Sequence, residues 1–307
     1  MLGIVTKSTG NQYQVRMETG ESFVCRIRGN LRLKEFEATD PVTVGDRVEI
    51  DMNDVEGGMH WISSLVERKN YIIRKSVKLS KQVQIIAANV DRAFVVATMV
   101  SPRTSLGFID RFLSTAEAYN IPGAIIFNKA DLYDEDMRNA VQELKELYEG
   151  IGYRVFLVST VSGEGLGELK EILKGKVNLF SGHSGVGKSS LINLLIPGLN
   201  LKTAGISAQH QKGVHTTTFA EMHLMPEGGY IIDTPGIREF GTIDFDTYEV
   251  SHFFPEIFKV GKNCRFNNCL HFSEKDCAVK EALKTGEVAF SRYESYLSIL
   301  SGQDNYK

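Results

Sequence analysis

The stretch Gly182–Ser189, with the sequence GHSGVGKS, has residue types and spacing suited to holding phosphate groups. It follows the apolar segment 177–180, which we expect to be a strand, and it precedes an amphipathic helix start at 190–195. Its glycines let successive backbone N–H groups point at a β-phosphate, and the helix N-terminus adds its positive end. Lys188 would bridge the β- and γ-phosphates, and Ser189 would bind Mg²⁺. The other residues expected around the phosphates are Gly182, His183, Ser184, Gly185, Val186, Gly187 and Ser190.

A second polar motif, NKAD at 128–131, follows the apolar segment 123–127. Guanine offers two neighbouring N–H donors, so Asp131 can accept two hydrogen bonds that adenine cannot supply. Asn128 would hold the loop and approach N7, and Lys129 would lay its alkyl stem along the ring. A polar loop after a strand is common, so the motif gains its weight from the phosphate loop. The residues assigned to guanine are Asn128, Lys129, Asp131 and Ser159, the last from the end of segment 153–158.

The sequence DTPG at 233–236 follows the apolar segment 230–232 and fits DxxG, a motif that contacts Mg²⁺ and the γ-phosphate. Asp233 would hold Mg²⁺ through water, and the Gly236 N–H would touch the γ-phosphate. The threonine cluster at 216–218 offers a second hydroxyl ligand, which we assign to Thr217, although Thr216 and Thr218 stay open and a simple polar turn is the alternative.

The residue after DTPG is Ile237, whose side chain can neither donate nor accept a hydrogen bond. Intrinsic hydrolysis of the bond to a bound γ-phosphate should therefore be slow until another group positions the attacking water. His215 lies beside the threonine cluster and is our candidate catalytic residue together with Lys188, because imidazole can orient water near neutral pH. A structural surface histidine is the alternative.

Three cysteines and one histidine fall within fourteen residues near the C-terminus: Cys264, Cys269, His271 and Cys277. Three thiolates and one imidazole suit tetrahedral zinc, and four protein ligands leave no open position, so the expected ion is one structural Zn²⁺. A disulfide is disfavoured in a reducing compartment. Cys25 lies outside this cluster, in a strand pattern, and is expected to be a small buried residue.

Composition limits the class of protein. The chain has 307 residues, 42% of them hydrophobic, with a formal net charge of -3, which predicts an ordinary globular protein of two or three domains. The apolar stretch 85–100 carries charged residues, so no transmembrane helix is expected, and the N-terminus lacks the pattern of a secretion signal. We therefore expect a cytoplasmic protein without a membrane partner, acting as a monomer.

Three regions differ in their hydrophobic period. Residues 1–70 show short alternating segments broken by glycines, which predicts a small β-barrel of the oligonucleotide-binding (OB-fold) type, although an SH3-type barrel would look the same. Residues 71–240, after a basic linker, alternate continuous apolar runs with helical patterns, as in a doubly wound α/β domain. Residues 241–307 combine the cysteine cluster with helices broken near Gly286, whose tyrosines we interpret as core rather than RNA-stacking residues.

Bulk charge argues against a protein that coats nucleic acid, but basic residues gather locally. The segment 22–34 has four bases and no acid, and the segment 68–81 has six bases and no acid. A solvated face that binds nothing is the alternative for each segment. The candidate RNA-binding residues are Arg26, Arg28, Arg32 and Lys34.

The motifs occur in an unusual order, with the guanine motif first, then the phosphate loop, the threonine cluster and DTPG. Ordinary GTPases begin with the phosphate loop, whereas the same sheet can form with its chain opened elsewhere. In this order and over essentially the whole chain, the sequence resembles the RsgA (YjeQ/YloQ) family, circularly permuted GTPases of small ribosomal subunit assembly.

The resemblance implies an OB-fold barrel, a permuted GTPase domain and a C-terminal zinc domain. It also implies GTP and GDP as ligands with Mg²⁺, binding to the small ribosomal subunit and its ribosomal RNA, and GTP hydrolysis that the subunit stimulates during late maturation. The alternative is an RNA-binding assembly factor that uses GTP as a ligand switch with little hydrolysis. An unrelated transport or signalling GTPase would bind no ribosomal subunit.

Overall fold

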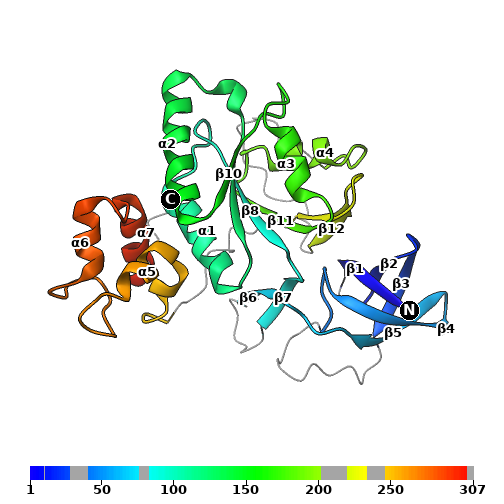
Figure 1. Cartoon of the computed structure of the whole chain (residues 1–307). Helices are drawn as coiled ribbons and strands as arrows, with labels where there is room; N and C mark the ends of the chain where they lie inside the picture. Colours follow the sequence, from blue (N-terminus) through cyan, green and yellow to red (C-terminus); the bar gives the residue numbers. More distant parts are fainter. Residues whose placement is uncertain (10, 28–40, 76–82, 202–219, 234–245, 303–307) are drawn as a thin grey trace, which may run out of the picture. The chain divides into compact units, whose positions relative to one another are not determined.

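The computed structural model describes residues 1–9, 11–27, 41–75, 83–201, 220–233 and 246–302. The chain divides into two compact units. The first comprises residues 1–93, 170–181 and 189–239, and the second comprises residues 94–169, 182–188 and 240–307. Within the described ranges, every helix is too short or too polar to cross a bilayer. Figure 1 labels most of the helices and strands used below.

A five-stranded barrel opens the first unit. Its strand order is β1-β2-β3-β5-β4, and β1 pairs again with β4 to close the sheet on itself. The alternating pattern of segments 13–17 and 22–27 puts one side chain in two into the interior, where Tyr13, Val15 and Cys25 are fully buried. The barrel expected from the sequence is thereby confirmed, and so is the burial of Cys25. Its strands are β1 (Leu2–Ser8), β2 (Tyr13–Met17), β3 (Ser22–Ile27), β4 (Arg47–Glu56) and β5 (Met59–Leu65).

Three more strands extend the sheet of the first unit: β11 (Val177–Ser181), β13 (Tyr230–Asp233) and β12 (Glu221–Leu224). β11 and β13 are parallel, whereas β12 runs antiparallel to β13 and also pairs with β1 of the barrel. The pairing with β1 is accompanied by an ion pair between Lys7 and Glu221 at 3.3 Å. The barrel is therefore continuous, within this unit, with part of the α/β sheet.

The sequence predicts a basic linker before the α/β domain, but part of the basic segment 68–81 is a strand. Residues Tyr71–Lys75 form β6, which pairs antiparallel with β7 (Val83–Ala88) in a separate two-stranded sheet. Arg68 does not face solvent, because its guanidinium donates to both oxygens of the buried Asp46, at 2.7 and 2.6 Å. The positive charge of Arg68 is therefore paired with a carboxylate inside the protein.

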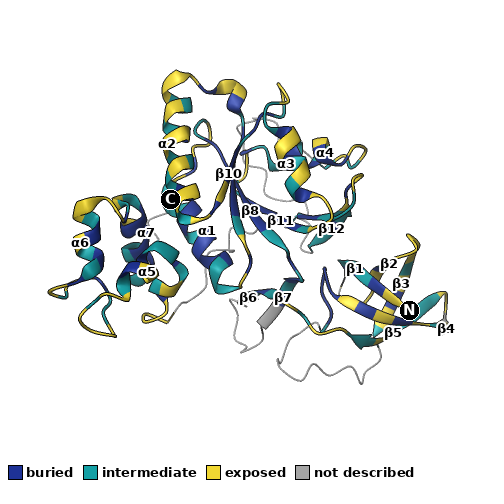
Figure 2. Ribbon diagram, in the orientation of Figure 1, coloured by how far each residue is buried: buried dark blue, intermediate teal, exposed yellow. Residues whose placement is uncertain are grey.

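The second unit contains the strands β9 (Gly123–Phe127) and β10 (Arg154–Leu157) and most of β8 (Arg92–Ala97). β9 and β10 are parallel, and β8 is buried along almost its whole length, as Figure 2 shows in dark blue. This burial explains the continuous apolar runs, because helices cover both faces of a parallel sheet. The helices of the α/β part are α1 (Leu106–Ala118), α2 (Glu135–Ile151), α3 (Leu166–Leu173) and α4 (Lys188–Leu195).

Two helix boundaries follow from capping residues. Ser105 caps α1 by accepting a hydrogen bond from the N–H of Phe108, and Asp134 caps α2 by accepting one from Met137, as the sequence predicted for α2. A 3-10 turn, η1 (Ala130–Leu132), connects β9 to this cap.

The C-terminal region, residues 246–302, forms short helices around its own core. Its helices are η2 (Val250–Phe253), α5 (Pro255–Gly261), α6 (Ala278–Thr285) and α7 (Phe290–Leu300). α6 ends at Gly286, which has a φ of 78° and so adopts the left-handed conformation that glycine favours at a helix end. Tyr296 is 0% exposed and Tyr293 7% exposed, which confirms that these tyrosines belong to the core.

Candidate functional site

The phosphate loop lies between β11 and α4, in the strand–loop–helix setting that the motif requires. Gly182 has a φ of 151° and Gly187 a φ of 89°, backbone angles that residues other than glycine rarely adopt. A Cβ atom at Gly187 would lie 2.4 Å from Nδ2 of Asn128, so glycine is also needed there for close approach. The loop is therefore shaped both by its own glycines and by the guanine motif.

Asn128 connects the two nucleotide motifs. Its side chain is fully buried, and its Nδ2 donates a hydrogen bond of 2.9 Å to the carbonyl oxygen of Val186 in the phosphate loop. This contact supports the expectation that Asn128 holds the loop. The Oδ1 atom of Asn128 is buried with no hydrogen-bond partner among the described residues, which leaves an acceptor at the centre of the site.

The next residues of the guanine motif are also held in place. Lys129 has a φ of 65°, and its ammonium donates to the carbonyl oxygen of Ser101 at 2.8 Å. Ser159 donates to Asp131 at 2.5 Å and accepts from the backbone N–H groups of Val161 and Ser162. The structure thus brings Ser159 to Asp131, and this hydrogen bond orients the carboxylate while leaving acceptor sites on both of its oxygens.

Tyr133 contacts the guanine motif, and no sequence motif marks this residue. Its hydroxyl donates to the carbonyl oxygen of Asn128 at 2.6 Å and accepts from the N–H of Met99 at 2.9 Å. Burial raises the pKa of Tyr133, so the hydroxyl stays protonated and can donate. The tyrosine therefore ties the loop after β8 to the loop after β9.

A ring contact at the second position of the phosphate loop was also missed. The ring of His183 lies 3.9 Å from the ring of Phe108, measured between centroids, with an interplanar angle of 31°. Phe108 belongs to the first turn of α1, more than seventy residues earlier in the chain. The spacing of α1 indicated an amphipathic helix, but no local pattern indicated which loop its first turn would contact.

The expected Mg²⁺ ligands are only partly within the described residues. Asp233 ends β13, where it is the parallel-strand partner of Phe180, so it lies at the same sheet edge as the start of the phosphate loop. Ser189 lies in the first turn of α4. Thr217 and its neighbours Thr216 and Thr218, together with His215, Gly236 and Ile237, lie outside the described residues. A carboxylate and a hydroxyl are suitable ligands for Mg²⁺.

The four cysteine-cluster residues converge in the C-terminal region, where their ligand atoms all lie within 4.8 Å of one another. Nδ1 of His271 lies 3.5 Å from Sγ of Cys264 and 3.4 Å from Sγ of Cys277, and these two sulfur atoms are 3.9 Å apart. Zinc–ligand bonds of about 2.3 Å to sulfur and 2.0 Å to nitrogen predict tetrahedron edges of about 3.8 and 3.5 Å. The cluster therefore fits a tetrahedral metal ion.

Two core tyrosines position the loop that carries His271. Tyr293 donates to the carbonyl oxygen of His271 at 2.6 Å, and Tyr296 donates to that of Leu270 at 2.7 Å. Burial lowers the pKa of His271, which favours the neutral imidazole that metals bind. Outer hydrogen bonds of this kind fix the orientation of a metal ligand.

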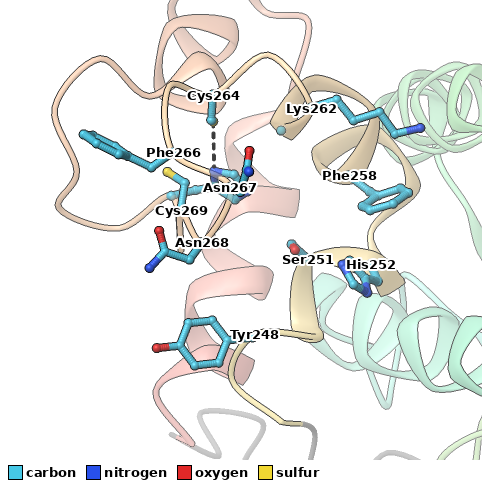
Figure 3. Close-up of a pocket in the computed structure, with 12 residues that line it drawn as sticks. Tyr248, Ser251, His252, Phe258, Lys262, Cys264, Phe266, Asn267, Asn268 and Cys269 are labelled. Carbon is cyan, nitrogen blue, oxygen red and sulfur yellow. Dashed lines mark hydrogen bonds between the residues drawn. The ribbon is translucent and has the colours of Figure 1, made fainter.

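A hollow of about 420 Å³ opens beside the cluster, and Figure 3 shows the residues around it. Cys264, Cys269 and His271 line it together with Tyr248 and Phe258. Three of the four residues of the cysteine cluster thus border an open hollow.

The candidate RNA-binding residues are described only at one position. Arg26 lies on β3 and is exposed, as an RNA contact requires, whereas Arg28, Arg32 and Lys34 lie outside the described residues.

Comparisons with known proteins agree with this geometry. A family model described as RsgA GTPase matches residues 65–243, and one described as RsgA N-terminal domain matches residues 2–59. A relative from Bacteroides fragilis, named small ribosomal subunit biogenesis GTPase RsgA, is 53% identical over 307 residues, which cover 100% of this chain and 98% of the relative.

Two solved structures are similar along the whole chain. YjeQ from Thermotoga maritima has a TM-score of 0.80 at 38% identity, covering 100% of this chain and 99% of that one. YloQ, described as a circularly permuted GTPase, has a TM-score of 0.76 at 28% identity, covering 100% of this chain and 96% of that one. The RsgA GTPase model spans more than half of the chain, and the guanine motif and the phosphate loop of the chain meet in the structure. This chain therefore belongs to the RsgA GTPase family.

Proposed function

We propose that this chain is a Mg²⁺-dependent GTPase that assists late maturation of the small ribosomal subunit and is stimulated by that subunit. The observation that carries the proposal is the bond from Asn128 to Val186, which joins a guanine motif to a phosphate loop that follows it in the chain. The name of the Bacteroides fragilis relative supports the assignment to ribosome biogenesis.

In this proposal the protein has three domains with separate tasks. Residues 1–70 form the OB-fold barrel, residues 71–240 the permuted GTPase domain and residues 241–307 the zinc domain. The barrel and the zinc domain contact ribosomal RNA, and Arg26 is the described member of the candidate RNA-binding set. The protein acts in the cytoplasm as a monomer.

The guanine base is recognised by four residues of the second unit. Asp131 accepts the two neighbouring N–H donors of guanine with its two carboxylate oxygens, since the bond from Ser159 uses only one acceptor site of Oδ1, and the buried hydrogen bond of Asn128 holds the loop. Lys129 covers the ring with its alkyl stem while its ammonium stays bound to Ser101. Adenine lacks both donors, so the site selects GTP over ATP.

The phosphates are bound by the loop backbone and by Lys188, with Ser184, Gly185 and Ser190 nearby in the chain. Mg²⁺, held by Ser189 and Thr217 and through water by Asp233, would neutralise charge between the β- and γ-phosphates. Gly236 contacts the γ-phosphate, and His215 orients the attacking water, which the apolar side chain of Ile237 cannot do. Zn²⁺ held by Cys264, Cys269, His271 and Cys277 would be structural, because four protein ligands would leave no open position for a substrate.

The decisive experiment measures GTP hydrolysis by the purified chain with and without small ribosomal subunits. Lys188→Ala is the blank for contaminating activity, and ATP is the control for base specificity. Stimulation of several-fold or more that is restricted to GTP supports the proposal. GTP binding without stimulation would instead favour an RNA-binding assembly factor that uses GTP as a ligand switch.

A further inference from the structure

A buried arginine joins helix α1 to the C-terminal helices. Arg292, on α7, is 0% exposed. Its NH1 donates to Oδ1 of Asp110 on α1 at 2.8 Å, and its Nε and NH2 donate to the two carboxylate oxygens of Glu256 on α5, at 2.7 and 3.2 Å. We call Asp110, Glu256 and Arg292 the buried triad.

Further contacts fix the position of the triad. Asp110 also accepts from the hydroxyl of Tyr148 at 2.7 Å and from that of Ser295 at 2.6 Å. The guanidinium carbon of Arg292 lies 4.6 Å from the centroid of the Phe254 ring. Burial favours loss of the arginine proton, but the two carboxylates outweigh it and hold the pKa of Arg292 well above its usual value. Arg292 therefore stays charged.

Stability alone is a weak reason for this arrangement. Removing a cation and carboxylates from water costs several kcal/mol per ion, and well-packed apolar side chains are often as stabilising. A buried ion pair does fix orientation, because the planar guanidinium donates good hydrogen bonds only to carboxylates in a narrow range of positions. The triad thus defines where α1 lies against α7.

The opposite side of α1 contacts the phosphate loop. Phe108 precedes Asp110 by two positions, and at 100° per residue the two side chains leave the helix about 200° apart. Phe108 lies against His183, with 3.9 Å between ring centroids. Pro102, just before the helix, approaches Gly185 so closely that a Cβ there would lie 3.2 Å from its Cδ. The N-terminal part of α1 therefore contacts the phosphate loop through Phe108 and the buried triad through Asp110.

We propose that Arg292 is a positioning residue for the phosphate loop. By holding Asp110, it holds the first turn of α1, and with it Phe108 against His183. The inference rests on the proposed function, and it gives the C-terminal region a part in nucleotide binding in addition to any contact with RNA. A partner that shifts α7 would then change the affinity of the phosphate loop for the nucleotide.

The test is GDP affinity, measured on the full chain with a fluorescent GDP analogue, because GDP binding depends neither on hydrolysis nor on ribosomal subunits. Arg292→Lys keeps the charge but loses the fork, and Phe108→Leu removes the ring contact without touching the triad. Each change should raise the Kd for GDP roughly 3- to 10-fold, and the double variant should be no weaker than the weaker single variant, since both act through one contact. Lys284→Met, at an exposed ion pair on α6, is the matched control and should stay within about twofold.

Two results would overturn the inference. One is an Arg292→Lys chain with a lower melting temperature but a Kd for GDP within about twofold of the unaltered chain, which would make the triad purely structural. The other is a double variant whose Kd is the product of both single effects. Asp110→Asn, nearly the same shape, is the second variant if Arg292→Lys does not fold. Failure of the unaltered chain to bind GDP would refute the proposed function as well, so the two failures are distinguishable.

Discussion

The N-terminal barrel and the C-terminal region are of similar size but are held together differently. The barrel closes through backbone hydrogen bonds between β1 and β4 around nine buried residues. The C-terminal region has eleven buried hydrophobic residues in its described core, yet α5 and α6 are separated by residues 262–277, which contain neither helix nor strand. All four residues of the cysteine cluster lie in this segment.

This difference teaches how a small region compensates for missing secondary structure. In the barrel, strand pairing satisfies the backbone and fixes the shape, so no metal is needed. In the C-terminal region, the irregular segment is fixed by side chains: the cysteine cluster, the tyrosine hydroxyls and the carboxylate of Glu274, which accepts from three backbone N–H groups. Metal loss should therefore affect the two regions very unequally.

The largest expected effect is the loss of the C-terminal fold when a metal ligand is removed. Cys277→Ser should remove a contribution on the order of 10 kcal/mol and unfold this region, whereas the barrel stays intact. The single tryptophan, Trp61, lies on β5 and so reports on the first unit rather than on the C-terminal region. Trp61 fluorescence should be unchanged while bound zinc and helical circular dichroism fall.

Cys25→Ala is the matched control for this prediction, because Cys25 is buried in the barrel. It should weaken the barrel and leave the zinc content at one ion per chain. A loss of the Trp61 signal in Cys277→Ser, matched by the same loss when a chelator removes the metal from the unaltered chain, would contradict the independence of the two regions.

The second effect concerns the buried ion pair of the barrel. Asp46→Asn leaves the guanidinium of Arg68 without its carboxylate in a site where Asp46 is 0% exposed, so the barrel should lose about 3–5 kcal/mol. Chemical denaturation followed by Trp61 fluorescence measures this loss. Lys7→Met, at an exposed ion pair, should cost less than about 1 kcal/mol, and a similar loss in both variants would count against the argument.

A smaller effect is expected at the support of the metal loop. Tyr296→Phe removes the hydroxyl that donates to the carbonyl oxygen of Leu270, so zinc affinity should fall by up to about tenfold, or about 1.4 kcal/mol. Competition with a chromophoric chelator gives the affinity. Tyr248→Phe, at a side chain that is 61% exposed, should leave it unchanged, and a loss there as large as in Tyr296→Phe would refute the role of the hydroxyl.

The smallest effect is acid sensitivity in the first unit. Partial burial raises the pKa of Asp91, but the Lys69 ammonium and the N–H of Val177 outweigh it and hold this pKa below its usual value. A carboxyl with a lowered pKa stabilises the fold above its unfolded pKa of about 3.9, and this contribution is lost as the pH falls through the folded pKa.

Denaturation followed by Trp61 should therefore show less stability, by under about 1 kcal/mol, as the pH falls below about 4. Asp91→Asn should lack this part of the acid dependence. An identical pH profile in both chains would assign the sensitivity to other carboxyl groups.

Much of the site could be predicted from local sequence. The glycines of GHSGVGKS have the positive φ values that a phosphate loop requires, and the spacing of the cysteine cluster brought four ligands within reach of one ion. Asp134 capped α2 as predicted. In each case the residues that interact lie within a few turns of chain, so their spacing alone carries the information.

Other features could not be predicted, because their partners are distant in the chain. Asp110 lies among apolar residues of α1, and its cation, Arg292, follows 182 positions later. The basic segment 68–81 was expected to be a linker because its charges hid the short alternation of β6, whose partner β7 follows after seven further residues. Charge and period describe one segment at a time, whereas these contacts depend on which segments meet.

The sequence by itself determined which chemistry this protein can do: a phosphate loop, a guanine motif and a metal cluster, each encoded within a short segment. Only the tertiary structure decided how these parts are joined. The sheet brings Asn128 to Val186, 58 positions later, and the C-terminal core places Arg292 beneath α1. The physical reason is that backbone conformation and ligand spacing are local properties, whereas sheet pairing and burial are decided by the whole chain.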